Sequence, residues 1–115
     1  MAKSDTRNFD LMCQAVVAGH LVALSYGGYD RLVEPHLHGY TAAGEEVVLC
    51  WQREGGSISA DSSHWRLFRI RQIEDFSILE AAFAPRPDFS PLTREIRSVH
   101  CGPRPHLWRS ASELQ

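Results

Sequence analysis

The stretch from Trp65 to Ile73, Trp-Arg-Leu-Phe-Arg-Ile-Arg-Gln-Ile, alternates large apolar and cationic side chains and constrains the fold more than any other segment. In an extended chain, successive side chains point to opposite faces. Trp65, Leu67 and Arg69 therefore share one face, and the residues between them share the other. Neither face is purely polar, which is typical of a strand in a small curled sheet with both faces partly covered.

Length and charge narrow the class of protein. A chain of 115 residues forms one domain and can build a core without disulfide or metal staples. Its net charge of −2 argues against a protein that coats nucleic acid through bulk electrostatics, because such domains carry a strong positive excess. Any anion binding must therefore be local.

The cysteines and the N-terminus predict the compartment. An odd number of cysteines, far apart and without paired spacing, argues against a disulfide framework and favours a reducing cytoplasm. The N-terminus lacks the apolar region of a signal peptide, and no run reaches the roughly 18 apolar residues of a spanning helix. We expect a cytoplasmic protein with no membrane partner. The three cysteines are Cys13, Cys50 and Cys101.

Apolar periodicity predicts one helix followed by short strands. Residues 9–18 show helical spacing, and Gly19 follows as a C-cap. Proline interrupts the second predicted strand, which continues to Tyr40 after a kink at Pro35. The sequence thus predicts a mostly β (α+β) fold, a bent five-stranded sheet or partly open barrel. The predicted strands are residues 20–26, 31–34 with its continuation to 40, 46–52, 65–70 and 73–79, with a loop over 53–63.

The ends of the chain differ from this central part. Residues 1–8 are predicted to be a short tail before the domain of residues 9–83. Residues 84–115 form a Pro-rich extension that runs over the domain. Within it, Ser90 and Pro91 resemble the start of a short helix that reaches about His100.

Several motifs together resemble the WYL domain over most of the chain. The strongest are Val33-x-Pro35 after Arg31, and Phe68-Arg69-Ile70-x-x-Ile73, which is similar to the family's Phe-Arg-Leu-Asp-Arg-Ile stretch. Small stand-alone members, which lack the usual winged helix-turn-helix, share further positions. Here these are Trp51-Gln52, Gly56-Ser57 and Trp65-Arg66.

The resemblance implies an Sm-like or SH3-like barrel and a bacterial regulatory setting. WYL domains occur in transcriptional regulators and phage-defence proteins, where they are thought to sense nucleic acid or nucleotide ligands. This chain departs from the pattern at two places. Val47 and Val48 replace the family's aromatic pair, and Arg71 and Gln72 replace its aspartate and second arginine.

Arg31, Arg66 and Arg69 are the candidate anion-binding residues. Arginine offers a planar fork of donors that fits phosphate, and a strand holds it rigidly. Arg69 lies in the matching motif and is the first candidate. The alternative is that each arginine pairs with a neighbouring carboxylate and serves only solubility. The carboxylates considered are Glu34, Glu74 and Asp75.

Polar and aromatic residues near the arginines complete the predicted site. Tyr26 and Trp51 can stack on a base or shape the pocket, Gln52 can orient the ligand, and His36 follows the Val33-x-Pro35 element. Aromatic residues in a small barrel are more often core, and this is what we expect of Phe68 and Phe76.

The sequence predicts no metal, no cofactor and no catalysis. His36-x-His38 with Cys50, His20 or His64 has the donor types of a metal site, but no established ligand spacing supports one. Cys50, between Leu49 and Trp51, is typical of a small buried hydrophobe rather than a nucleophile.

Taken together, these features predict a non-enzymatic sensing module. Its expected ligand is a nucleotide or a short single-stranded nucleic acid, in bacterial transcriptional regulation or phage defence. The alternative is a protein–protein interaction or oligomerisation module with a copy of itself or a regulatory protein as partner.

Overall fold

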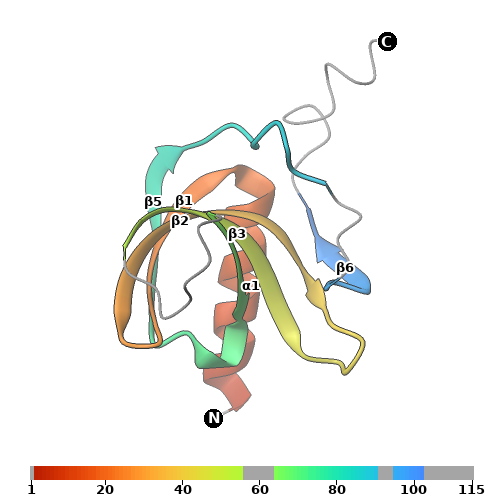
Figure 1. The fold of residues 1–115 in the computed structure, drawn as a ribbon. Helices are drawn as coiled ribbons and strands as arrows, with labels where there is room; N and C mark the ends of the chain where they lie inside the picture. Colours follow the sequence, from red (N-terminus) through yellow and green to blue (C-terminus); the bar gives the residue numbers. More distant parts are fainter. Residues whose placement is uncertain (1, 56–63, 91–94, 103–115) are drawn as a thin grey trace.

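The computed structural model describes residues 2–55, 64–90 and 95–102, with side chains from Asp10 onward. It shows one helix and a mostly β remainder (Figure 1), which confirms the predicted mostly β (α+β) fold class. The elements, in chain order, are α1 (Ala2–Ala18), β1 (His20–Tyr26), β2 (Tyr29–Tyr40), β3 (Glu46–Gly55), β4 (Trp65–Arg69), the 3₁₀ turn η1 (Ile70–Gln72), β5 (Asp75–Ala82) and β6 (Ser98–Cys101).

The strands form one antiparallel sheet in the order β4-β3-β2-β1-β5, and β6 pairs with the end of β2. Because η1 joins β4 to β5, the two outermost strands of this order are neighbours along the chain. The sheet therefore bends strongly but does not close. It contains one more strand than the sequence predicted, and that strand lies in the C-terminal extension.

The tight β1–β2 hairpin fixes the register of the sheet. Tyr26 pairs with Tyr29 across a two-residue turn. The turn residues Gly27 and Gly28 have φ of 60° and 84°, values that glycine adopts without steric cost.

Helix α1 covers the inner face of the bent sheet. Met12, Ala15 and Val16 are at most 1% exposed and pack against apolar residues of the strands. The strand residues of this core are Val22, Leu24, Val33, Val48, Cys50 and Phe68. Burial of Phe68 confirms its predicted core position, and Phe76 packs against the same cluster. At the end of α1, Gly19 has φ 75° and donates its N–H to the Ala15 carbonyl, as predicted for a C-cap.

Strand β2 continues past Pro35 to Tyr40, as predicted, with a register shift between Pro35 and Leu37. The shift adds a residue to β2, so the alternation of faces is interrupted. His38 consequently lies beside α1 and β6, whereas His36 contacts aromatic rings of the C-terminal extension. The expectation that these two histidines share one face is wrong for this reason.

Both ends of the chain differ from the sequence-based predictions. Helix α1 begins at Ala2, so residues 2–8 are helical rather than an irregular tail. The helix expected over residues 91–100 is wrong for its last part, because Ser98–Cys101 forms β6. Pairing with β2 and burial of Ile96 against Leu37 and Val47 outweigh the helical spacing of the apolar residues. The first part of that predicted helix, residues 91–94, lies outside the described residues.

Cys13 and Cys101 form a disulfide between α1 and β6, with 5.5 Å between their Cα atoms. The expectation of no disulfide is wrong. The two cysteines are 88 residues apart in the sequence, and Cys101 is brought to α1 by the pairing of β6 with β2. Because that long-range pairing is not visible in the sequence, cysteine spacing could not reveal the disulfide. The predicted cytoplasmic location, which depended on unpaired cysteines, stays a prediction.

Candidate functional site: an arginine pair on the inner face

Three neighbouring strands bring Arg31, Gln52 and Arg66 to one end of the inner face. Val33, two residues after Arg31, pairs with Gln52, and Cys50, two residues before Gln52, pairs with Arg66. Residues two apart in a strand point to the same face. Arg31, Gln52 and Arg66 therefore lie on the same face of the sheet as the core residues Val33, Cys50 and Phe68. We call Arg31 and Arg66 the arginine pair.

Arg31 is a buried cation, 6% exposed. Its Nη2 donates to the Tyr26 carbonyl at 2.8 Å, and its Nη1 donates to Gln52 Oε1 at a longer 3.4 Å. Its Nε is buried and has no hydrogen-bond partner within the part of the chain that the structure describes. Aromatic rings surround the guanidinium at 5.3 to 5.7 Å; these are Phe68, Tyr26 and Tyr29.

The electrostatic setting of Arg31 favours an added anion. Burial, followed by the nearby positive charge of Arg66, lowers the pKa of Arg31. No carboxylate of the described residues forms an ion pair with Arg31. Two adjacent cations repel each other at low dielectric, and an anion between them would offset that repulsion.

Tyr26 and Gln52 complete the surroundings of the arginine pair, as the sequence predicted. The Tyr26 hydroxyl donates to Gln72 Oε1 at 3.1 Å and accepts from the Arg69 N–H at 3.2 Å. Its ring meets Phe68 edge-on, with 4.8 Å between centroids. Gln52 donates from Nε2 to the Gly55 carbonyl at 2.9 Å. Both side chains are thus held in place by their neighbours.

Arg69, the first candidate from sequence, is not brought to the arginine pair. Its side chain is exposed and its Nε donates to both oxygens of Glu45 at 3.2 Å. This hydrogen bond to Glu45 raises the pKa of Arg69. The position of Arg69 therefore fits the alternative considered from sequence, in which an arginine pairs with a carboxylate at the surface.

Glu34 is a buried carboxylate on the opposite, outer face of the sheet, 1% exposed. Arg86 donates to it from Nε at 2.8 Å and from Nη2 at 2.6 Å, and Arg53 Nε lies 3.1 Å from Oε2. These bonds hold residues 83–90, which we call the strap, against the sheet. The first described part of the extension therefore lies against the sheet. Sequence analysis missed Arg86, although a carboxylate within an apolar strand indicates a buried cationic partner.

His36 lies under the strap rather than beside Arg31. Its Nδ1 is 2.8 Å from the Glu34 carbonyl, and the Arg86 backbone N–H donates to its Nε2 at 3.0 Å. Because a carbonyl only accepts and an N–H only donates, these contacts assign the neutral tautomer with the proton on Nδ1. Burial lowers the pKa of His36. The ring is also packed among Trp65, Phe83 and Phe89, at 4.9 to 5.2 Å.

Trp51 is also on the outer face, and other side chains stack on its ring. The Arg86 guanidinium carbon lies 3.5 Å from the ring centroid, and the His64 ring is stacked on it at 4.5 Å and 16°. Two groups this close cannot share one side of the ring, so they occupy opposite sides. A base could stack on Trp51 only by displacing one of them.

A surface hollow of about 430 Å³ adjoins Arg31 and is lined partly by Ser25, Asp30 and Asp75. Two carboxylates face this hollow, so its charge does not by itself favour an anion. The candidate anion site is therefore the arginine pair itself rather than this hollow, whose lining does not include Arg66.

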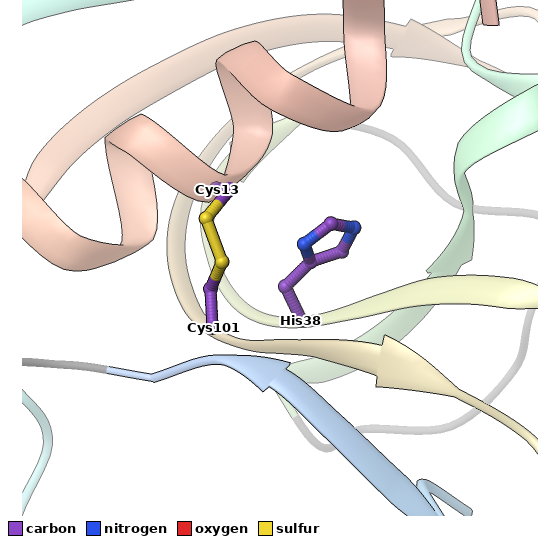
Figure 2. A group of neighbouring side chains, drawn as sticks. All are labelled: Cys13, His38 and Cys101. Carbon is purple, nitrogen blue, oxygen red and sulfur yellow. A yellow bond between two sulfur atoms is a disulfide. The ribbon is translucent and has the colours of Figure 1, made fainter. Parts of the chain in front are cut away.

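Cys50 has the surroundings of a core residue. It is 0% exposed, and burial raises the pKa of its thiol well above the usual value. A protonated, buried thiol is a poor nucleophile, and the burial of Cys50 agrees with its predicted role as a small core residue. The only metal-type donor group among the described side chains joins Cys13, His38 and Cys101 (Figure 2). Of the residues considered from sequence as metal ligands, only His38 belongs to this group.

Comparison of the chain with protein-family models, with curated proteins and with solved structures finds no match. No helix in the described part of the chain has the length and hydropathy needed to cross a membrane. Residues 56–63, which include the Gly-Ser motif, lie outside the described residues.

Proposed function

We propose that the protein is a non-enzymatic binding module whose arginine pair takes a phosphate group of a nucleotide or a short single-stranded nucleic acid. The observation that carries the proposal is Arg31, a buried guanidinium next to a second cation, with an Nε that no described residue satisfies. An unsatisfied buried donor is costly, and a phosphate oxygen is a strong acceptor for it. The negative net charge of the chain makes such binding a local effect.

The neighbouring side chains have distinct roles in this proposal. Gln52, bonded to Arg31, orients the guanidinium. The Tyr26 ring, next to Arg31 and fixed by its two hydrogen bonds, shapes the edge where a base or sugar would lie. The resemblance to WYL domains supports the same ligand class and a role in bacterial regulation or phage defence.

Binding of a fluorescently labelled single-stranded oligonucleotide tests the proposal. Anisotropy is measured over increasing salt for the wild type, Arg66→Gln and Arg69→Gln. Arg66→Gln should weaken binding by about 10- to 100-fold, the loss expected for one hydrogen bond to a charged group. The slope of log affinity against log salt should fall by about 0.7 for each phosphate contact removed from a single strand.

Arg69→Gln is the matched control, because it removes the same charge from the same strand at a position paired with Glu45. Its binding should stay within about twofold of the wild type, as expected for an exposed ion pair. Equal losses in the two variants would indicate non-specific attraction. Absence of binding at low salt, for both the oligonucleotide and nucleoside triphosphates, would rule out the proposed ligand class.

A second candidate function rests on the edge of the sheet. Strand β5 pairs with β1 on one side, and its other edge has no strand partner among the described residues. Such an edge can add a strand from another chain. An interaction module would show a concentration-dependent mass in light scattering, and Ser77→Pro on β5 should abolish it. A monomer at every concentration would contradict self-association.

A further inference from the structure

Three metal-type donors from distant parts of the sequence meet between α1 and the sheet. Cys13 belongs to α1, His38 to β2 and Cys101 to β6, and the side-chain donor atoms all lie within 4.8 Å of one another. Figure 2 shows the His38 ring beside the disulfide. His38 and Cys101 are direct cross-strand partners, so the sheet register itself places them side by side.

The cluster is buried enough to exclude most water, yet has a side open to solvent. His38 is 0% and Cys101 7% exposed, while Cys13 is partly exposed. Two thiolates and an imidazole are ligands that Zn²⁺ prefers, and three protein ligands leave a fourth position for water. The partial exposure of Cys13 gives an ion a path to the site.

The spacing of the two cysteines suits both a disulfide and a metal. Their Cα atoms are 5.5 Å apart, within the range that disulfides use. With Zn–S bonds of about 2.3 Å and tetrahedral angles, two zinc-bound sulfurs lie about 3.8 Å apart. Side-chain rotation after reduction can supply that separation without moving α1 away from β6.

From this geometry we propose that Cys13, His38 and Cys101 form a zinc site whenever the disulfide is reduced. A dithiol or phosphine reductant supplies two electrons, the S–S bond breaks, and each sulfur takes up a proton. Zn²⁺ then displaces both protons and binds the two thiolates and the His38 imidazole. Removal of two electrons by a disulfide or peroxide oxidant reforms the S–S bond and releases the ion. The same three elements are thus held together in either redox state, and zinc reports which state is present.

Cobalt substitution tests the site in the full chain. Protein reduced with a phosphine and freed of metal is titrated with Co²⁺, and thiolate-to-cobalt charge transfer is recorded in the near ultraviolet. Reduced wild type should bind one equivalent, and the oxidised wild type should show no charge-transfer band. Added Zn²⁺ should displace the cobalt and appear as one ion per chain in native mass spectrometry.

Variants identify the ligands. Cys13→Ser should lose the thiolate band, and His38→Ala should weaken binding by at least about tenfold, since loss even of a residue that only supports a ligand costs 10- to 100-fold. Cys50→Ser removes a buried thiol outside the cluster and should bind as wild type does. If the variants fail to fold, the comparison of oxidised and reduced wild type still decides. No charge-transfer band in reduced wild type, or an unchanged band in Cys13→Ser, would overturn the proposal.

Discussion

At the residue scale, Glu34 combines burial with charge more fully than any other described carboxylate. It is 1% exposed, and both cations that meet it come from more exposed side chains, Arg86 at 31% and Arg53 at 42%. Breaking a buried pair costs more than it would at the surface, because the remaining charges lose their partner after desolvation. The ion pair that holds the strap is therefore sensitive to loss of the Glu34 charge.

Glu34→Gln should lower the free energy of unfolding by about 2 kcal/mol, less than for a fully buried pair because both arginines are partly exposed. Urea unfolding followed by tryptophan fluorescence measures this loss. Glu45→Gln is the control, because Glu45 pairs with Arg69 at the exposed surface. It should cost less than about 1 kcal/mol. Equal costs for the two variants would show that Glu34 does not hold the strap as described.

His36 predicts a pH dependence of stability. Its pKa in the folded protein is below the ordinary value of 6.5, because of burial, while the nearby charges of Glu34, Arg86 and Asp88 act in both directions. Between that lowered pKa and about 6.5, the unfolded chain binds more protons at this residue than the folded one. The free energy of unfolding should therefore fall as the pH falls through this window.

Urea unfolding of wild type and His36→Phe at about pH 7.5 and about pH 5.5 measures this contribution. Phenylalanine keeps a ring among Trp65, Phe83 and Phe89 but does not titrate. The variant should thus be less stable at the higher pH, since two hydrogen bonds are lost, and should lose less on acidification. The same loss on acidification in both proteins would contradict this role of His36.

Four of the seven residues named from residue type and from the resemblance lie near one another, namely Tyr26, Arg31, Gln52 and Arg66. Arg31, Gln52 and Arg66 share a face because of the register of β2, β3 and β4 and the alternation of side chains along each strand. Alternation does not say which faces meet the core, nor where a bulge reverses it, so His36 and Trp51 were expected at the same site. The ion pair of Arg69 with Glu45 depends on the register between β3 and β4 and on the conformation of the turn before β3. The alternation of side chains in the sequence specifies neither of these.

At the scale of elements, β6 depends on one glycine of β2. A Cβ at Gly39 would meet the Ser98 carbonyl oxygen and would lie 2.8 Å from the Ile96 side chain. The position is therefore too close to β6 for any side chain. The backbone of β6 would have to move away from β2, and Cys101 is on that strand.

Gly39→Ala should destabilise the protein by about 1–3 kcal/mol, as overpacking does. Gly102→Ala is the control, because a Cβ there would make an ordinary 3.5 Å contact with Leu37. It should change stability by less than about 0.5 kcal/mol. Hydrogen exchange of the β6 amides should rise in Gly39→Ala alone. Unchanged protection of β6 would show that the two strands are not packed this closely.

The first five strands were predictable because each is a run of β-prone residues, and glycines lie next to the first three of them. The sixth was not, because Ser98–Cys101 is short, and the spacing of its Val99 from Ile96 fits a helix equally well. Long-range pairing with β2 and the packing of Ile96 decide the conformation. Local sequence carries no information about a partner strand about sixty residues away.

At the scale of the whole molecule, two separate attachments hold the C-terminal extension to the sheet. The strap is fixed to the outer face through Glu34 and His36, and β6 is fixed to β2 and, by the disulfide, to α1. The disulfide therefore links the first element of the chain to the last described one across a bent sheet that does not close. Its loss should affect the entire fold rather than a local loop.

Reduction of the Cys13–Cys101 disulfide in chelator-containing buffer should lower the free energy of unfolding by about 3 kcal/mol. A bond that closes a loop of 88 residues restricts the unfolded chain strongly, with an entropic limit near 4–5 kcal/mol. Urea midpoints of oxidised and reduced wild type measure the loss, and Cys50→Ala, oxidised and reduced, is the control that excludes an effect of the third thiol. Because α1 and β6 also pack through the core around Met12, the reduced protein should still fold. Adding Zn²⁺ to the reduced protein without chelator should restore part of the stability if the proposed site exists. Equal midpoints of the oxidised and reduced forms in chelator would show that the disulfide does not stabilise the fold.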